Sequence, residues 1–314
     1  MTRLRVAFMG SPALGVPALR ALHAAPDIEL VQVVTLGDRR RGRRGGTVPT
    51  PVGEAALDLD VALLRWERGD RAAVEAVLAP LALDVIVVIA FARILPPPLL
   101  ALPRLGCLNL HASLLPWGRG ASPIQHAILE GLAESGWSAM LMDAGLDTGP
   151  VLTTHALTLN ARWTAGDLTD ALAACAGPFL LRALRGWRDG ELAPVAQDDN
   201  AATLTRKIPA EAGGLDWSLP AVALDRRVRA YSPSPGAWCR RDGERLGLLA
   251  VAPAPRQGDA APGEVMAARP RLLVACGEGA LELQRVQPPG RRPMDAPSYL
   301  NGRPLRVGER LENG

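Results

Sequence analysis

The sequence predicts an α/β fold, in which a doubly wound, mostly parallel β-sheet is followed by a small β-barrel of the OB type. Strand-like and helix-like segments alternate over the first 150 residues, which is typical of βαβ units. After about residue 190 the segments become brief and strand-like and are separated by Pro/Gly turns. The length of 314 residues corresponds to two domains of roughly 150 residues each. We therefore expect a first domain over residues 1–190, a linker over 191–206 and a second domain over 207–314.

The first three expected strands lie in the N-terminal part of the chain. Arg5–Met9 is a short apolar run, and Ser11 and Pro12 after it fit the N-cap and the first position of a helix. Glu29–Thr35 is rich in β-branched residues. Asp84–Ala90 is continuously apolar, as in parallel strands that are buried on both faces. Strands separated by helices predict parallel pairing.

The alternation continues to about residue 142. The expected elements are a strand at Cys107–Leu110, a helix at Pro123–Glu130 and a strand at Ser138–Met142. In the second domain, apolar residues recur at helical spacing over Leu219–Ala230. The expected strands of that domain are Leu246–Val251, Arg271–Ala275 and Leu281–Val286.

The composition is that of an ordinary soluble globular protein, with 48% hydrophobic and 21% charged residues. The most apolar run, Val85–Ala92, is far shorter than the roughly 20 residues that span a bilayer, and the N-terminal segment lacks the layout of a signal peptide. The cysteines are scattered without a Cys-x-x-Cys pair, and the histidines do not complete a zinc site. We expect a monomeric cytoplasmic enzyme with reduced cysteines, no metal and no membrane segment.

Positive charge is concentrated in the C-terminal third. Residues 207–314 contain 16 Lys and Arg against 12 Asp and Glu, a net charge of +4, whereas residues 1–206 have a net charge of −1. One cationic run lies in the first half, where Arg39–Arg44 contains five arginines. Such a run fits a solvated loop as well as a phosphate-binding loop, and phosphate attraction alone does not define which nucleic acid is bound.

Polar residues with a clear chemical meaning follow two strands of the first domain. Within Cys107–Pro116, Asn109 and His111 are two positions apart on a strand, so their side chains lie on the same face. Ligands of open α/β sheets bind at the carboxyl ends of strands. The Gly-rich segment Met142–Pro150 also follows a strand, and its Asp147 could reach the imidazole of His111.

These three residue types suit acyl transfer to a nucleophile that the substrate provides. An amide N–H and an imidazolium stabilise an oxyanion, while a carboxylate orients the imidazole or carries protons. No Ser or Cys nucleophile accompanies them, and the sequence has no GxGxxG, P-loop, GxSxG or HExxH motif. A histidine that is merely hydrogen-bonded within a turn is the alternative interpretation.

Several segments resemble the signature of the folate-dependent formyltransferases. They are NLHASLLP at Asn109–Pro116, GRGASPIQHAI at Gly118–Ile128, MDAGLDTG at Met142–Gly149, FMGSP at Phe8–Pro12, FARILP at Phe91–Pro96 and LDWS at Leu215–Ser218. The resemblance covers nearly the whole chain, and its central segments are highly specific. It implies a Rossmann-like formyltransferase domain followed by an OB-like domain that binds tRNA.

The resemblance implies that a formyl group passes from 10-formyltetrahydrofolate to the α-amine of methionyl initiator tRNA. The family's catalytic residues correspond to Asn109 and His111, which would stabilise the oxyanion, and to Asp147, which would orient His111 and assist proton transfer. Asp143 would support the Asp147 loop or contact the pterin. The family's folate site corresponds to Ser113, Leu114, Leu115 and Pro116, with the backbone around Phe91, Ala92, Arg93 and Ile94 as the wall of the pterin pocket.

The resemblance also implies where tRNA would bind. The arginine run aligns with an inserted loop of the family that recognises the acceptor end of the tRNA, with Arg43 at its key position. The predicted tRNA contacts are Arg39, Arg41, Arg43, Arg44 and, at the domain junction, Lys207, which is the only lysine of the chain.

Two departures from the family pattern concern the folate site. The family usually has Tyr-Gly where this chain has Phe91-Ala92, which would alter the pterin contacts. The usual Pro-Arg-Trp-Arg-Gly is here Pro116-Trp117-Gly118-Arg119-Gly120, which keeps the arginine of the loop and moves the tryptophan.

Three other functions are compatible with parts of the sequence. A formyltransferase that acts on an amino-sugar nucleotide would use the same catalytic residues but would not need the arginine run. A formyltetrahydrofolate hydrolase would replace the amine with water. A protein of the OB type that only binds nucleic acid would not need Asn109, His111 and Asp147, so the presence of all three argues against it.

Overall fold

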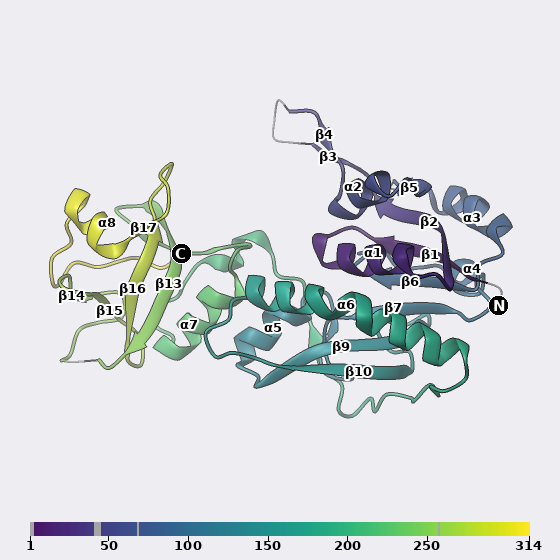
Figure 1. Ribbon diagram of the computed structural model, residues 1–314. Helices are drawn as coiled ribbons and strands as arrows, with labels where there is room; N and C mark the ends of the chain where they lie inside the picture. Colours follow the sequence, from purple (N-terminus) through teal and green to yellow (C-terminus); the bar gives the residue numbers. More distant parts are fainter. Residues whose placement is uncertain (1–2, 41–44, 68, 257) are drawn as a thin grey trace. The chain divides into compact units, whose positions relative to one another are not determined.

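The computed structural model describes residues 3–40, 45–67, 69–256 and 258–314 and divides into two compact units (Figure 1). Unit 1 consists of Met1–Pro123, Glu134–Thr158 and Thr169–Thr205. Unit 2 consists of Ile124–Ala133, Leu159–Leu168 and Arg206–Gly314. The boundaries expected from the sequence are those of domains that fold independently. The two compact units do not test independent folding, so these boundaries stay a prediction.

Unit 1 is built on a twisted sheet with the strand order β10-β9-β7-β6-β1-β2-β5. Its strands are β1 (Leu4–Gly10), β2 (Ile28–Leu36), β5 (Leu63–Trp66), β6 (Val85–Ile89), β7 (Cys107–His111), β9 (Glu134–Leu141) and β10 (Val151–Thr158). The pairs from β7 through β6, β1 and β2 to β5 are parallel, whereas β9 is antiparallel to β7 and β10 is antiparallel to β9. The predicted mostly parallel, doubly wound sheet is therefore confirmed.

Helices cover both faces of this sheet, because the residues of its central strands are apolar on both sides. Every residue of β6 is buried. On one face, Met9 and Ile86 pack in a cluster with Leu78. On the other face, Gly177 lies so close to Ala21 that a Cβ atom there would be 2.8 Å from the Cβ of Ala21. The helices of this unit are α1 (Val16–Ala24), α2 (Pro51–Asp58), α3 (Arg71–Leu78), α4 (Pro97–Leu100) and most of α6 (Ala165–Arg188), with short 3₁₀ turns at Ala13–Gly15 and Ala79–Leu81.

The start of the first helix differs from the prediction. Ser11 does not cap a helix; α1 begins only at Val16, after a 3₁₀ turn, and Gly15 is its N-cap residue. The Oγ atom of Ser11 instead accepts hydrogen bonds from the amide of Leu36 at 3.2 Å and from the Oγ1 atom of Thr35 at 3.3 Å. The hydroxyl thus connects the ends of two adjacent strands, which local sequence does not reveal.

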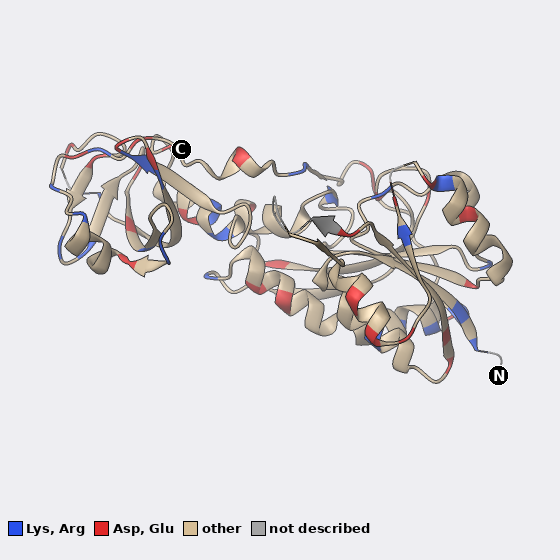
Figure 2. Ribbon diagram, turned by 90° about the horizontal axis from the view of Figure 1, so that it is seen from above, with Lys and Arg blue, Asp and Glu red and all other residues tan. Residues whose placement is uncertain are grey.

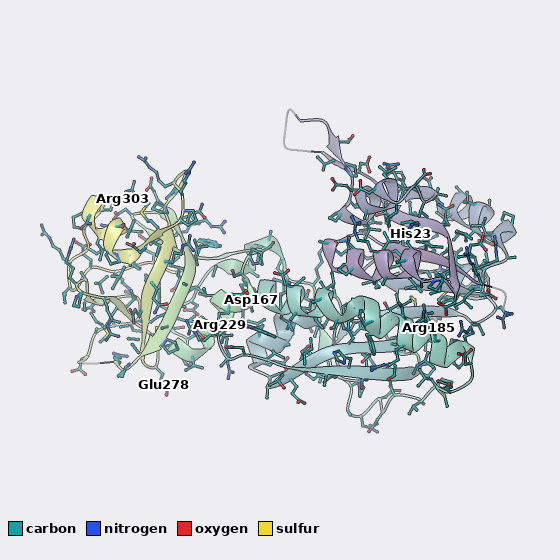
Figure 3. The ribbon with its side chains drawn as sticks, in the orientation of Figure 1. His23, Asp167, Arg185, Arg229, Glu278 and Arg303 are labelled. Atoms are coloured by element: carbon teal, nitrogen blue, oxygen red, sulfur yellow. The ribbon has the colours of Figure 1, made fainter. Side chains whose placement is uncertain are left out.

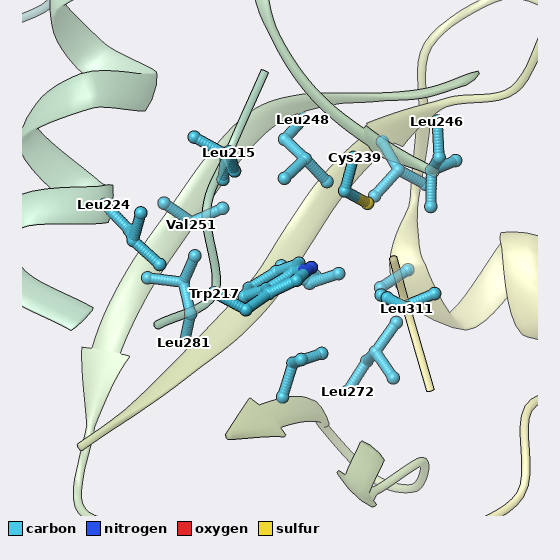
Figure 4. Packing of buried hydrophobic residues seen from close by; sticks show 14 of the residues in the cluster. Leu215, Trp217, Leu224, Cys239, Leu246, Leu248, Val251, Leu272, Leu281 and Leu311 are labelled. Atoms are coloured by element: carbon cyan, nitrogen blue, oxygen red, sulfur yellow. The ribbon is translucent and has the colours of Figure 1, made fainter. Parts of the chain in front are cut away.

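Unit 2 contains a curled antiparallel sheet with the strand order β12-β13-β16-β15-β14, and β17 pairs with β16. The strands are β12 (Ala237–Arg241), β13 (Glu244–Ala254), β14 (Val265–Ala267), β15 (Leu272–Ala275), β16 (Ala280–Gln287) and β17 (Met294–Asp295). The helices are α5 (Pro123–Glu130), α7 (Ala221–Ala230) and α8 (Ala296–Gly302), and Ala210–Gly213 forms a 3₁₀ turn. The fully buried Trp217 lies at the centre of the core, between Leu281 and Leu311 (Figure 4). This is the small β-domain that the sequence predicts.

Short strand pairs and the remaining cysteines complete the description. Strand β3 (Arg39–Arg40) pairs with β4 (Thr47–Val48), and β8 (Arg119–Gly120) pairs in parallel with β11 (Leu204–Thr205). All four cysteines are free thiols, and burial raises the pKa of Cys107 and of Cys239 to about 12. Among the residues that the structure describes, no helix is long and apolar enough to cross a membrane, and no His, Cys, Asp or Glu side chains group as a metal site.

Candidate active site

Strand β7 directs Asn109 and His111 toward one face at its carboxyl end. Because side chains alternate along a strand, these two residues share the face of Cys107, whose thiol donates to the carbonyl of Leu99 in α4. Asn109 and His111 lie further along the strand than Cys107, and both are 7% exposed. Two polar side chains are thus buried side by side at the end of a central strand, where they need partners.

Asp147 provides those partners. Its Oδ1 atom is 3.4 Å from the Nδ2 atom of Asn109, and its Oδ2 atom is 3.6 Å from the Nδ1 atom of His111. The other ring nitrogen of His111, Nε2, is 2.8 Å from the carbonyl oxygen of Gly118. The proximity expected from the sequence is therefore present.

Both ring nitrogens of His111 face oxygen atoms that can accept hydrogen bonds but cannot donate them. A neutral imidazole has a single N–H, so one nitrogen would present a lone pair to an oxygen. The doubly protonated imidazolium donates in both directions and has the carboxylate of Asp147 as its counter-charge. An imidazolium at this position would lie beside an amide donor, and this combination stabilises negative charge on a carbonyl oxygen.

The loop that carries Asp147 is held by its own polar groups. Asp147 has a left-handed backbone with φ of 55°. Its Oδ2 atom also accepts a hydrogen bond from the amide of Gly120 at 2.9 Å. Asp143 accepts from the amide of Gly145 at 2.9 Å and from the hydroxyl of Thr148 at 2.7 Å. These contacts place Asp143 as a support of the loop, and its contact with a pterin stays a prediction.

The turn after β7 is fixed by a buried serine of β9. Ser138 Oγ donates to the carbonyl of Ser113 at 2.7 Å and accepts from the amide of Leu115 at 2.9 Å. The hydroxyl of Ser113 donates to the carbonyl of Trp117 at 2.6 Å. The predicted folate residues Ser113, Leu114, Leu115 and Pro116 therefore form one ordered turn beside His111.

A second loop of predicted folate residues follows β6, the parallel neighbour of β7. Phe91 is buried and packs on Trp66 with 5.5 Å between the ring centroids. Ala92 has a positive φ of 56°, and Ile94 is 73% exposed. A cavity of about 470 Å³ borders this loop; it is lined by Trp66, Gly69, Arg71, Ala92, Arg93 and Ile94. Trp66 and Arg71 were not among the candidates from sequence, because a lone aromatic or arginine carries no motif.

A polar segment that had no candidate residue, Gln197–Thr205, also contacts the site. Gln197 Nε2 donates to the carbonyl oxygens of Asp147 at 2.9 Å and of Gly149 at 2.7 Å. Thr203 Oγ1 accepts from the amide of Gly118 at 2.8 Å. The only sequence signal was a segment without periodicity, so these contacts could not be predicted.

The structure does not test the predicted tRNA contacts. Arg41, Arg43 and Arg44 lie outside the described residues. The backbone of Arg39 belongs to β3, and Lys207 belongs to unit 2. Their roles stay predictions.

In unit 2, Lys and Arg positions occur on several strands and loops, interspersed with Asp and Glu (Figure 2). Arg240 and Arg245 are opposite each other on β12 and β13. Their guanidinium carbons lie 5.1 Å and 4.6 Å from the ring centroid of Trp238. The buried Nε1 atom of Trp238 has no hydrogen-bond partner among the described residues. We call Trp238, Arg240 and Arg245 the Arg–Trp face; such a combination of cations and an aromatic ring suits nucleic acid.

Comparison with known proteins identifies the family. A family model described as formyl transferase matches residues 4–184, and a model of the formyl transferase C-terminal domain matches residues 207–304. The chain belongs to the formyl transferase family. The expected formyltransferase fold is thereby confirmed.

Individual members of the formyl transferase family match nearly the whole chain. A methionyl-tRNA formyltransferase of Pseudomonas fluorescens is 42% identical over 96% of this chain and 93% of its own length. One of Cereibacter sphaeroides is 43% identical over 98% of this chain and 99% of its own. The crystal structure of an N-formyltransferase from Helicobacter canadensis, in complex with folinic acid and dTDP-3-aminofucose, is similar in fold, with a TM-score of 0.66 and 15% identity over 90% of this chain and 99% of that one.

Proposed function

We propose that this formyl transferase moves the formyl group of 10-formyltetrahydrofolate to the α-amine of methionyl initiator tRNA in the cytoplasm. The observation that carries the chemical part is the cluster of the buried Asn109 and His111 with the partly exposed Asp147, which has donors for an oxyanion and no nucleophile of its own. The acceptor is supported by the relatives named methionyl-tRNA formyltransferase, which match nearly the whole chain.

In the proposed reaction the methionyl amine attacks the formyl carbon. The carbonyl electrons move to the formyl oxygen, where the free N–H of the Asn109 amide and the His111 imidazolium stabilise the negative charge. As the tetrahedral intermediate collapses, the bond between the formyl carbon and N10 of the folate breaks. N10 gains the proton that the amine loses, and Asp147 is the carboxylate close enough to assist that transfer.

The described residues fit a folate. The co-substrate has a fused bicyclic pterin ring with hydrogen-bonding edges at one end and carboxylates at the other. We propose that the ring lies between the turn Ser113–Pro116 and the backbone of Phe91–Ile94. The neighbouring cavity of about 470 Å³ has the size of a ligand pocket, and Arg71 and Arg93 on its wall provide the positive charge that carboxylates require.

We propose that tRNA is held by phosphate contacts with unit 2 and with the arginine run. The Arg–Trp face supports this assignment, because its exposed guanidinium groups attract phosphate. Arg39, Arg41, Arg43, Arg44 and Lys207 are the further proposed contacts. Arg43 would read features of the acceptor end that mark the initiator.

The proposed function is tested by offering the enzyme three acceptors together with 10-formyltetrahydrofolate. The acceptors are methionyl initiator tRNA, an amino-sugar nucleotide and water alone. We expect N-formylmethionyl-tRNA as the product and little formate released without tRNA. Formylation of the amino-sugar nucleotide alone, or formate release at the same rate with and without tRNA, would contradict the proposal.

A further inference from the structure

We propose that Gln197 and Arg119 are positioning residues that hold Asp147 in the orientation that faces His111. Neither residue contacts the Asp147 carboxylate itself. They would act through the backbone of the loop that carries it. This inference rests on the proposed function, because it concerns the same reaction.

The amide group of Gln197 connects the two parts of the network. Its Nε2 atom donates to the carbonyl oxygens of Asp147 and Gly149, at 2.9 and 2.7 Å, so both hydrogens of the amide are used. Its Oε1 atom accepts from Nε of Arg119 at 3.0 Å. Since Arg119 can only donate, the oxygen of the amide must face it, and the nitrogen must face the two carbonyls.

Arg119 is in turn fixed by its surroundings. Its side chain is 7% exposed, and its Nη2 atom lies 2.8 Å from the carboxylate of Asp199. A buried guanidinium with two directed partners has little freedom to turn. The guanidinium of Arg119 therefore sets the orientation of the Gln197 amide. In that orientation the Nε2 hydrogens point toward the carbonyl oxygens of Asp147 and Gly149.

The Asp147 loop requires such a restraint. Asp147 is a non-glycine residue in the left-handed region, a conformation that persists only when its surroundings impose it. The amide of Gln197 binds the carbonyl oxygens of Asp147 and Gly149 together, and this restrains the backbone of the loop between them. The carboxylate then reaches His111 and Asn109 together.

The same segment fixes the opposite side of the site. Thr203 accepts from the amide of Gly118, and Thr205 Oγ1 donates to the carbonyl of Arg119 at 3.1 Å. The segment between these contacts is Gly118–Gly120. The carbonyl of Gly118 faces His111, and the amide of Gly120 donates to the carboxylate of Asp147. A Cβ atom at Gly120 would lie 2.4 Å from the Thr205 carbonyl oxygen, so this approach admits only glycine.

The test compares Gln197→Met, which keeps the side-chain length without the amide, with the control Asp198→Asn. The Asp198 carboxylate is in the same segment, and its only hydrogen-bond partner among the residues that the structure describes is Asn200. We expect Gln197→Met to lower kcat for formyl transfer about 10- to 100-fold, since displacement of a supporting partner has effects of this size. KM for folate and tRNA and the thermal midpoint should stay near wild type, and the control should keep full kcat.

A double-mutant cycle separates positioning from a purely structural role. Because Gln197 acts through Asp147 in this account, adding Gln197→Met to Asp147→Asn should change the single-turnover rate by less than about twofold, although each change alone lowers it. Gln197→Asn, which keeps the amide on a shorter side chain, provides the same comparison if the methionine variant does not fold. Arg119→Lys should reproduce part of the Gln197→Met loss, because lysine cannot hold Gln197 and Asp199 simultaneously.

Unchanged kcat in the folded Gln197 variants, or effects that add fully in the cycle, would overturn the inference. A rise in KM without a fall in kcat would overturn it as well, because that result would indicate a binding role. If the wild-type enzyme itself forms no formylmethionyl-tRNA, the proposed function fails. If the wild type is active and the Gln197 variants are too, only this inference fails.

Discussion

The carboxylate of Asp147 lies 3.6 Å from Nδ1 of His111, so it faces one nitrogen of the imidazole ring. The opposite nitrogen of the ring faces the carbonyl of Gly118. These two contacts therefore define the direction of the imidazole ring. Asn109 adds an amide donor on the same face, so an oxygen that becomes negative there has donors of two kinds.

Removal of the Asp147 charge should impair turnover without preventing folate binding. In Asp147→Asn the imidazolium loses its counter-charge, and proton transfer loses its carboxylate. We expect the single-turnover rate of formyl transfer to fall at least about 100-fold, because a positioned acid or base contributes roughly 10²–10⁴-fold. Rapid-quench kinetics at saturating folate and tRNA measure this rate. A rate near wild type would show that Asp147 is not part of the chemistry.

Arg43 should control the choice of tRNA more than the binding of folate. Phosphate contacts position a nucleic acid, whereas base contacts specify it. We expect Arg43→Ala to reduce the ratio of kcat/KM for initiator over elongator methionyl-tRNA, with folate affinity unchanged. Both tRNAs are compared at one salt concentration. If the ratio does not change, the arginine run is a solvated loop.

The Arg–Trp face should contribute to the salt dependence of tRNA binding. We expect Arg245→Gln to weaken tRNA binding and to lower the slope of log affinity against log salt by about one, as for the loss of one phosphate contact. Arg303→Gln is the matched control, because the guanidinium of Arg303 (labelled in Figure 3) is already paired with Glu244. A filter-binding titration at several salt concentrations measures the slopes. Equal slopes for wild type and Arg245→Gln would exclude this face as a tRNA contact.

An ion-pair cluster should make stability depend on pH. Arg185 (labelled in Figure 3) and Arg188 of α6 lie 2.7 and 2.9 Å from the Asp27 carboxylate. The hydrogen bond from Arg185 is the main cause that holds the pKa of Asp27 below its usual value. Because the folded pKa is lowered, the pair stabilises the fold above the unfolded pKa of about 4, and this contribution is lost as the pH falls below it.

Asp27→Asn tests that cluster. We expect it to lower the free energy of unfolding by about 1 kcal/mol at pH 7, given the partial exposure of the pair. The difference from wild type should shrink as the pH is lowered from 5 toward 2. Urea unfolding at each pH gives the comparison. A difference that is the same at all these pH values would mean that the carboxylate charge contributes nothing.

The parts of the fold that the sequence predicts are those with a local signal. The helix Pro123–Glu130 and the apolar strand β6 follow from periodicity and composition. The direction of β9 does not, because a strand pattern is the same in either direction. Helix α6 was not among the expected elements, since Gly177 and Pro178 in its middle ordinarily interrupt a helix.

The residues of the site also divide into those with a local sequence signal and those without one. Asn109 and His111 are two residues apart on one strand, so their shared face is a local property, and Asp147 follows from its Gly-rich loop. Gln197 is 50 residues from the loop that it contacts, and only the folded chain brings the two together. The residues proposed to take part in the reaction were therefore accessible from sequence, whereas the residues proposed to hold them in place were not.

The central claim is that Asn109 and His111 stabilise the oxyanion of formyl transfer to methionyl-tRNA. The most direct measurement is the single-turnover rate for wild type, Asn109→Ala and His111→Ala, each saturated with 10-formyltetrahydrofolate and methionyl initiator tRNA, together with the folate affinity of each. The account predicts a rate about 10²–10³-fold lower in each variant with folate affinity retained. Rates close to wild type in both variants would contradict it.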